Sequence, residues 1–513
     1  MALTGGLSNL SDALKTVDGS IIPVFVTIVV VGVILYHVKA SHDAGLSHVP
    51  GPFLARYSNL HSWIEAQRWH GTNVCYLRRL HDQYGDVVRV SPRRVSVRDP
   101  DAIPVIYGMK ASLDKSDLIR AAQPLGKGPD NLFSVRDAKS HSSLRKAVAN
   151  AYAISTISQY EPRINDTLAA FFKVLDEEGK ETNIGKWAHY YVYDVQGNMT
   201  YGEPLGYLEN RKDAVGLIWQ TKFLLKYVQF TMPMPILHDI ASFVIRTFRV
   251  QKATVFHRLS ARKVEERIKR STGGSSNDGK FDILAHFVSS REKYGDIMTK
   301  EQIITHCMVN VVAGTGTSTT SITNIIKYLV KNVDAQERLH LELKSAGAGF
   351  PASWREVQSL PFLEGLVREG IRLRGSDGFN PLARVAGSQG MVLPNGIQLP
   401  AGTLVGVKPS VASMSKKTFG EQPHLFLPER WLQMPGECAQ DYRERRSRMD
   451  RGDMSFSSGT RGCIGRGIAL MEIYKMIAAL IYKYKLLPAK DAHHSNSHFD
   501  FYCCSLEPRS VEE

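Results

Sequence analysis

One cysteine of this chain stands inside a short glycine-rich stretch that is followed at once by a helical pattern. The stretch runs from Phe456 to Gly465 and places Arg461 two residues before Cys463. Apolar residues then recur at helical spacing, at Ile464, Ala469, Leu470, Ile473 and Ile477. We therefore expect Cys463 at a helix N-terminus, where unpaired backbone N–H groups and the positive end of the helix dipole stabilise a thiolate.

The other residues of the stretch indicate a flat ligand. Gly459, Gly462 and Gly465 lack a Cβ atom where such a ligand has to approach the backbone. Arg461 brings a permanent cation that can meet an acidic group on the ligand. We interpret the stretch as a thiolate held against a large planar metal complex, and a haem iron with a cysteine ligand fits best. The alternative is a buried structural cysteine in a glycine turn.

The stretch resembles the cysteine-ligand loop of the cytochrome P-450 family, Phe-x-x-Gly-x-Arg-x-Cys-x-Gly, at every fixed position. The resemblance implies a mostly α fold with small β-sheets (α+β), in which haem b (iron protoporphyrin IX) lies between a long central helix and this loop. It also implies that Cys463 is the metal ligand and takes part in catalysis. The loop residues that it assigns to cofactor binding are Phe456, Gly459, Arg461, Cys463 and Gly465.

A long helical pattern follows Thr299 and Gln302, which have the spacing of a capping box. Apolar pairs recur along it at 303/304, 307/308, 311/312, 325/326 and 329/330. Its middle, residues 313–320, reads Ala-Gly-Thr-Gly-Thr-Ser-Thr-Thr, and these are poor helix formers, each glycine costing about 1 kcal/mol against alanine. We therefore expect another group to press against the helix at this point; the alternative is tight helix packing through small residues.

In the family, this long helix crosses the distal haem face with the pattern Ala-Gly-x-acid-Thr. Ala313 and Gly314 match its first positions, and the resemblance assigns them to cofactor binding. Thr317 matches the threonine whose hydroxyl helps to order water that protonates dioxygen. Gly316 stands at the catalytic position of the acid, so the usual carboxylate is missing.

Further charged residues match family motifs. Glu369 and Arg372, three positions apart, share a helix face. With Arg430 in Pro-Glu-Arg-Trp, they resemble the family's structural Glu–Arg–Arg network. The resemblance places Arg384, Arg145 and His141 at the haem carboxylates, although the family more often has tryptophan at the position of His141. For Arg145 and His141, the alternative is a solvated helix face.

The remaining pattern predicts the elements around these motifs. Residues 84–106 alternate apolar and polar positions between turn signals and predict a β-hairpin. The segment 143–270 is largely helical by period. Residues 380–412 alternate like short strands, with a turn at 394–396.

The net charge and the cysteine content of the chain limit which partners and compartments are expected. The chain has 513 residues, and its 64 Lys+Arg against 50 Asp+Glu give a net charge of +14. The basic residues are dispersed and no zinc-finger spacing occurs, which favours a membrane surface or an acidic protein partner over nucleic acid. The six cysteines form no C-x-x-C pair and are too sparse for a disulfide scaffold, which favours a reducing compartment.

An uncharged apolar run from 21 to 38 predicts a transmembrane helix, which spans about 27 Å at that length. Asp12 and Asp18 precede it in place of a basic region, so we favour an uncleaved anchor over a cleaved signal peptide. We predict an anchor at 1–40, a proline-rich hinge at 41–52 and a haem-thiolate catalytic domain at 53–513. This organisation implies a single-pass protein of the endoplasmic reticulum membrane with a cytosolic catalytic domain.

The predicted function is that of a monooxygenase that oxidises a small apolar substrate with dioxygen. Overall, the chain looks similar to fungal microsomal members of the family, notably the pisatin-demethylase-like branch, which implies a secondary-metabolite intermediate (a terpenoid, polyketide or alkaloid) as substrate. Electrons are expected from NADPH through NADPH-cytochrome P-450 reductase, with cytochrome b5 as a possible second donor. A basic run at 443–451 before the cysteine loop is the expected docking surface, with a solvated loop as the alternative.

Two other functions remain open at this point. Because Gly316 replaces the acid, the enzyme could instead catalyse a rearrangement, dehydration, coupling or peroxide-dependent step. The second alternative is a non-enzymatic haem-binding sensor.

Overall fold

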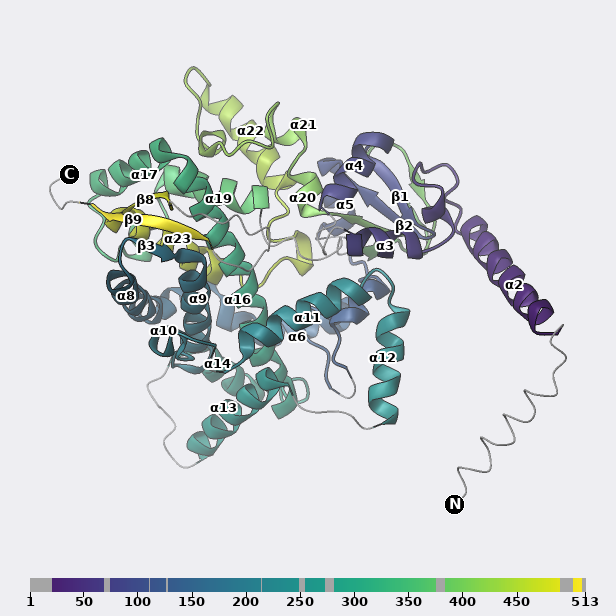
Figure 1. Ribbon diagram of the computed structural model, residues 1–513, viewed down its shortest axis with the longest axis horizontal. Helices are drawn as coiled ribbons and strands as arrows, with labels where there is room; N and C mark the ends of the chain where they lie inside the picture. Colours follow the sequence, from purple (N-terminus) through teal and green to yellow (C-terminus); the bar gives the residue numbers. More distant parts are fainter. Residues whose placement is uncertain are drawn as a thin grey trace.

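A single long helix, α16 (Lys300–Lys331), runs through the middle of the molecule, with the other elements around it (Figure 1). The computed structural model describes residues 21–68, 74–109, 111–125, 128–213, 215–248, 254–272, 281–374, 383–489 and 502–509. Within these ranges helices dominate, and the strands are few and short. The predicted α+β class is therefore confirmed.

The helices that precede α16 include the segment predicted as an anchor and most of 143–270, which confirms the helical prediction for that segment. Their bounds are α2 (Ile21–Asp43), α3 (Leu60–Arg68), α4 (Val74–Tyr84), α5 (Ile103–Tyr107), α6 (Ala138–Val148), α7 (Ile154–Ile157), α8 (Glu161–Glu178), α9 (Ile184–Tyr201), α10 (Tyr207–Asn210), α11 (Leu217–Thr231), α12 (Ile236–Thr247), α13 (Val255–Thr272), α14 (Ile283–Ser289) and α15 (Arg291–Tyr294).

The helices that follow α16 end with the one after the cysteine loop. They are α17 (Val333–Ser345), α18 (Trp354–Val357), α19 (Pro361–Arg374), α20 (Pro409–Ala412), α21 (Lys416–Phe419), α22 (Ala439–Gly452) and α23 (Arg466–Lys483). Short 3₁₀ turns connect several elements: η1 (Leu54–Arg56), η2 (Pro100–Ala102), η3 (Asp117–Ala122), η4 (Ala149–Tyr152), η5 (Ser158–Tyr160), η6 (Pro428–Trp431) and η7 (Gly459–Arg461).

The described strands form three small sheets. The first has the order β1-β2-β7-β4, with β1 (Val87–Ser91), β2 (Arg94–Val97), β7 (Leu404–Val407) and β4 (Arg384–Val385). The second has the order β3-β9-β8, with β3 (Glu181–Asn183), β9 (Cys503–Pro508) and β8 (Tyr484–Pro488), and the third pairs β5 (Met391–Val392) with β6 (Gln398–Leu399).

The strand register agrees with the sequence pattern. β1 and β2 pair antiparallel, with Val88 opposite Ser96, which confirms the hairpin predicted within 84–106. β2 then runs parallel to β7, with Val95 opposite Val405. β4 pairs antiparallel with β7 and brings Arg384 opposite Val405, so this sheet delivers a predicted site residue to the interior.

The middle of α16 stays helical because neighbouring helices pack closely on it. α9, α13, α19 and α23 all contact α16. A Cβ atom added at Gly314 would lie 2.5 Å from the side-chain amide of Gln196 on α9, so the group that presses on the helix there is the Gln196 side chain. The hydroxyls of Thr317 and Thr320 donate to the carbonyl oxygens of Ala313 (2.7 Å) and Gly316 (2.8 Å), one turn back.

The start of α16 follows its prediction in part. The Thr299 hydroxyl accepts a hydrogen bond from the backbone N–H of Gln302 at 3.2 Å, as an N-cap does. The Gln302 side chain instead donates to the carbonyl oxygen of Asp130 at 2.9 Å. Only one half of the capping box is formed, because a distant loop offers the amide a partner.

Helix α2 covers the apolar run at 21–38 and extends away from the body of the protein (Figure 1). In the part of the chain that the structure describes, no helix is both long and apolar enough to cross a membrane. The predicted membrane anchor is therefore not confirmed. The segment after α2 packs on β1: the backbone N–H of Arg89 donates to the carbonyl of Pro50 at 2.7 Å, and Leu46 and Val49 are buried.

Candidate active site

The cysteine loop is closed by its own backbone. The N–H of Gly462 donates to the carbonyl of Gly459 at 3.0 Å, and the N–H of Cys463 donates to that of Phe456 at 2.9 Å. Gly459 has a φ of +68°, and a Cβ atom there would lie 1.6 Å from the carbonyl oxygen of Tyr107 at the end of α5. Only glycine fits this close approach. α23 then begins at Arg466 with Gly465 as its N-cap, so the predicted helix start is confirmed.

The Cys463 thiol keeps accessible surface, although protein atoms crowd around it. Burial raises the pKa of this thiol, while the backbone N–H of Gly465 and the charges of Arg145 and Arg466 oppose the rise. The N–H group at the helix start thus acts in the direction that the sequence predicted, and desolvation outweighs it. A metal ion bound at the sulfur would favour the thiolate as well.

Cationic side chains from four segments converge beside the loop. Arg145 of α6 donates to the carbonyl of Gly462 at 2.8 Å, and Arg461 donates to the carbonyls of Val135 (3.0 Å) and Arg136 (2.8 Å). Burial and, to a smaller extent, nearby cations lower the pKa of His141 to about 3. Those cations are Arg461, Lys115, Arg145 and Arg384.

Lys115 is a member of this cluster that sequence reasoning missed. Its ammonium group donates to the carbonyl of Phe133 at 2.6 Å, and its backbone bridges to Arg384. Burial lowers its pKa well below the usual value, and Arg384 and Arg461 add to the effect. No sequence motif marks this lysine, so its position beside Arg384 follows only from the tertiary structure.

The cationic cluster beside the cysteine loop favours binding of a negatively charged group. Burial, together with the charge of Arg384, lowers the pKa of Arg461 to about 10. Asp114 and Asp137 partly oppose this shift, but their oxygens accept hydrogen bonds from the backbone N–H groups of Ala138 (2.9 Å) and Ser140 (2.5 Å) at the start of α6. Because like charges in a poorly solvated place repel, these groups suit a ligand that brings negative charge of its own.

The middle of α16 has accessible positions, although much of the helix is buried. Ala313 and Thr317 are exposed and Gly314 and Gly316 half-buried, whereas Ser318 and Thr319 on the adjoining positions are buried. The exposed positions share one face of the helix, since they are four apart. This small-residue face lacks bulk and leaves room for a flat ligand.

Glu369, Arg372 and Arg430 meet in the interior. The two Glu369 carboxylate oxygens accept from Arg372 Nε (2.9 Å) and Arg372 Nη2 (2.7 Å), and Arg430 Nε lies 3.3 Å from Glu369 Oε1. Trp431 Nε1 donates to the same carboxylate at 2.9 Å, and so does the N–H of Leu427 at 3.1 Å. Arg430 also donates to the carbonyls of Phe419 and Gln422, so the network ties α19 to the segments that lead to the cysteine loop.

Comparison with known proteins decides the family. The family model described as cytochrome P-450 matches residues 50–507. The chain belongs to the cytochrome P-450 family. It is 30% identical over 498 residues to the cytochrome P-450 monooxygenase cicH of Emericella nidulans, covering 93% of this chain and 96% of the relative. It is 31% identical over 459 residues to a cytochrome P-450 monooxygenase of Aspergillus terreus, covering 86% and 90% respectively.

A third relative has the same printed activity. The cytochrome P-450 monooxygenase vrtE of Penicillium aethiopicum is 30% identical over 456 residues, covering 86% of this chain and 85% of the relative. This P-450 is therefore a fungal-type monooxygenase with a haem iron cofactor. The sequence prediction of an enzyme of this family is confirmed, over the sensor alternative.

The residues of this P-450 fit a haem. The accessible thiol of Cys463 suits the iron, the cationic cluster suits the two carboxylates, and the small-residue face of α16 suits the flat macrocycle. When bound, the haem supplies the oxidative chemistry. Phe456, at the start of the loop, has the guanidinium of Arg466 5.7 Å from its ring centroid.

Proposed function

We propose that this protein is a membrane-associated monooxygenase that inserts one oxygen atom of dioxygen into a small apolar substrate, an intermediate of fungal secondary metabolism. The proposal rests above all on one observation: an accessible cysteine thiol stands beside a buried cluster of cations. NADPH is the electron source through NADPH-cytochrome P-450 reductase, with cytochrome b5 as a second donor. The fungal monooxygenase relatives support this assignment.

The proposal assigns roles to most of the predicted site residues and to Lys115, which the structure adds. Cys463 binds the iron of haem b. The arginines Arg145, Arg384 and Arg461 hold its carboxylates, with Lys115 and the neutral imidazole of His141 as further hydrogen-bond donors. Thr317 orders water on the exposed face of α16, and Gly316 leaves space there in place of an acid. Glu369, Arg372 and Arg430 keep the loop in position.

The hollow beside the cysteine loop suits docking of an acidic electron donor. It measures about 660 Å³ and lies between α5 and α22, with Gly459 of the loop in its wall. Arg445 and Arg446 of the basic run are engaged inside the protein, with Glu437 at 2.7 Å and Glu364 at 2.6 Å. The exposed Arg448 and Arg451 are thus the stronger candidates for a partner's carboxylates.

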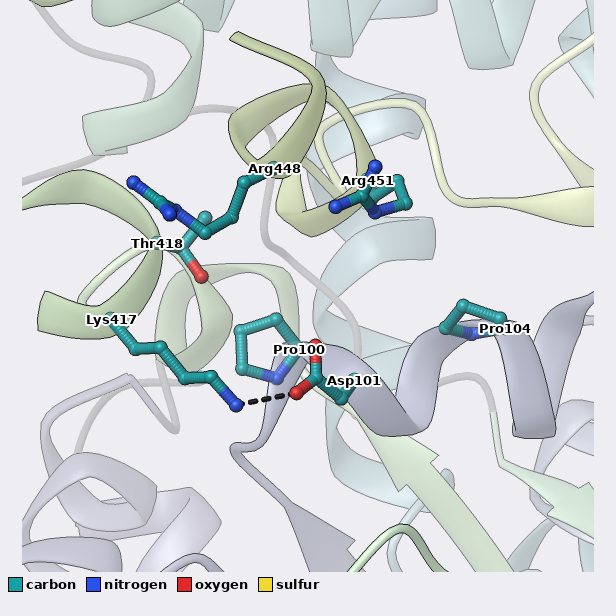
Figure 2. A pocket seen from close by; sticks show the side chains of 7 residues that line it. All are labelled: Pro100, Asp101, Pro104, Lys417, Thr418, Arg448 and Arg451. Carbon is teal, nitrogen blue, oxygen red and sulfur yellow. Dashed lines mark hydrogen bonds and ion pairs between the residues drawn. The ribbon is translucent and has the colours of Figure 1, made fainter. Parts of the chain in front are cut away.

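A second, smaller hollow continues this basic surface (Figure 2). It has a volume of about 90 Å³ and is lined by Arg448 and Arg451 on one side and by Lys417, which pairs with Asp101, on the other. Three cations against one carboxylate leave the surface positive, and such a surface raises the association rate of an acidic protein.

Charge reversal at Arg448 and Arg451 is expected to weaken the reductase interaction. The variant Arg448→Glu/Arg451→Glu should raise the reductase concentration for half-maximal NADPH oxidation by about tenfold at low salt, and less at high salt, because surface charges are screened. Reversal of two exposed arginines outside the hollows, Arg291→Glu/Arg355→Glu, is the matched control. Equal effects of the two double variants would refute docking at this surface.

Two helices, α2 and α12, present apolar side chains that could contact a membrane in this proposal. α2 carries the apolar run, and α12 turns apolar side chains outward: Ile236, Ile240 and Phe243 are 56%, 54% and 67% exposed, while His238 and Ser242 face inward. In the view of Figure 1 the two helices lie toward the same side. An outward apolar helix face suits a lipid surface. We therefore propose an α2 anchor in the endoplasmic reticulum membrane, a hinge after it and a cytosolic catalytic domain.

Product analysis tests the function. A host that expresses a reductase, with and without this protein, is expected to differ by an oxygenated metabolite whose formation requires NADPH, reductase and dioxygen. Incorporation of labelled oxygen from dioxygen identifies the reaction. Turnover that needs none of the three would favour the rearrangement, dehydration, coupling or peroxide-dependent chemistry that Gly316 leaves open.

A further inference from the structure

A buried arginine at the start of β2 has no partner for its charge. The Arg94 side chain is only 4% exposed, and its Nε and Nη1 are buried without a hydrogen-bond partner in the described part of the chain. Burial lowers the pKa of Arg94 to about 10, against smaller opposing effects of Tyr76 and Asp117. Asp117 does not neutralise this cation, because its carboxylate pairs with Arg120 at 3.3 Å.

A tyrosine beside Arg94 is unsatisfied in the same way. Tyr76 of α4 is 4% exposed, and its hydroxyl is buried without a partner among the described residues. Burial raises the pKa of Tyr76 and the charge of Glu65 adds to the rise, whereas the charge of Arg94 opposes it. Glu65 itself pairs with Arg68 at 3.0 Å. Two hydrogen-bond donors, a guanidinium and a phenol, therefore lie within electrostatic reach of each other with no acceptor of their own.

Other buried arginines show what Arg94 lacks. Arg89 of the same hairpin is 2% exposed, and its Nη2 donates to the carbonyl oxygens of Ser41 (3.1 Å) and Pro92 (2.8 Å). The guanidinium of Arg372 has its carboxylate at 2.7 Å. A buried cation without such acceptors costs free energy that an apolar side chain of similar size avoids. Packing alone therefore does not account for an arginine at position 94.

Apolar side chains connect this place with the cationic cluster beside the cysteine loop. Arg94 lies opposite Leu404 of β7, and Leu404 lies opposite Val385 of β4. Two strand spacings, about 10 Å, thus separate Arg94 from the strand that carries Arg384. Leu404 packs against one buried apolar cluster, which contains Leu118, Ile119, Val228, Met232 and Ala383, the neighbour of Arg384.

We propose that Arg94 and Tyr76 bind the carboxylate of the substrate, whose apolar part lies along the side chains from Leu404 to Ala383. This assignment rests on the proposed function and narrows its apolar substrate to an apolar carboxylic acid. Arg94 donates N–H groups and Tyr76 its O–H to the carboxylate oxygens, and such charge-assisted hydrogen bonds are stronger than neutral ones.

The number of donors favours a carboxylate over a phosphate. One guanidinium and one hydroxyl match a single negative charge better than the charge of about −2 that a phosphate carries. The carboxylate reaches Arg94 when the Tyr76 side chain turns aside, since no hydrogen bond among the described residues holds the Tyr76 hydroxyl in place.

Binding of dodecanoate to the holoenzyme tests the site. The variant Arg94→Met is expected to bind dodecanoate about tenfold to a hundredfold more weakly than the wild type, and Tyr76→Phe about fivefold more weakly. Dodecanol, which has the same chain without the charge, should bind wild type and Arg94→Met equally. A wild type that binds no dodecanoate, or an Arg94→Met variant that binds it as the wild type does, would overturn the proposal.

Urea unfolding without ligand separates a binding role from a structural one. Arg94→Met should unfold at the same or a higher urea concentration than the wild type, because it removes an unpaired buried charge. Arg89→Met, the control on the same hairpin, should unfold at a lower concentration, because it loses five hydrogen bonds. If Arg94→Met is as unstable as Arg89→Met, Arg94 is a structural residue and the proposal fails.

The haem absorption shows whether the bound carboxylate belongs to the substrate. Dodecanoate is expected to shift this absorption in the wild type, and about tenfold more of it should be needed in Arg94→Met. Binding that depends on Arg94 but leaves the haem absorption unchanged would refute the assignment to the substrate. Failure of NADPH-dependent oxygenation would count against the proposed function alone, because none of these measurements needs the reductase.

Discussion

Replacing Cys463 by alanine is expected to abolish the red-shifted carbon monoxide absorption that thiolate ligation gives to a reduced haem protein, together with all monooxygenase turnover. The reason is that Cys463 provides the accessible thiol in the closed loop before α23, next to Arg145. In the proposed function the sulfur is a direct ligand of the iron, so no neighbouring group would replace it. The measurement is the difference spectrum of the reduced protein with and without carbon monoxide.

A second cysteine offers a matched control. Cys438 is exposed and caps the start of α22 by accepting the N–H of Asp441 at 3.3 Å. Serine keeps that cap, so Cys438→Ser should retain both the absorption and the fold. If the red-shifted band survived in Cys463→Ala, the assignment of the iron ligand would be wrong.

Substitution of Glu369 by glutamine is expected to lower the free energy of unfolding by about 3–5 kcal/mol, the usual cost of breaking a buried ion pair. Arg372 and Arg430 would then be buried beside an amide in place of their counter-ion. Because the network also holds Trp431 and the backbone of Leu427, we expect the segment toward the cysteine loop to loosen and haem to be lost more readily. Urea titration and the haem content of purified protein measure the two effects.

An exposed ion pair shows what charge removal costs at the surface. Glu429 pairs with Arg338 at 2.8 Å, and both side chains are about half exposed. Glu429→Gln should change the free energy of unfolding by about 1 kcal/mol or less. A Glu369→Gln variant no less stable than Glu429→Gln would show that the buried network does not hold the fold.

Short sequence patterns were sufficient for the parts of the site that are continuous in the chain. The loop around Cys463, the helix start at Arg466 and the pair Glu369–Arg372 each depend on spacing over one or a few turns. Local spacing determines which side chains share a helix face or a turn, whatever lies around them. For the same reason the hairpin β1–β2 and the extent of α16 were predictable.

Tertiary structure decided what depends on segments far apart in the chain. Lys115 joins the cationic cluster because an isolated bridge brings it to Arg384, and no local pattern marks it. The pKa of the Cys463 thiol is raised because burial, which spacing does not reveal, outweighs the helix start.

The same holds for the surface charges and for the buried arginine. Arg445 and Arg446 looked like free surface charges in the sequence, yet each finds a carboxylate on another segment. Arg94 reads as one polar position of a short strand until α4 and η3 come close to it. Solvation and electrostatic energies depend on all surrounding atoms, and the chain brings those atoms together only when it folds.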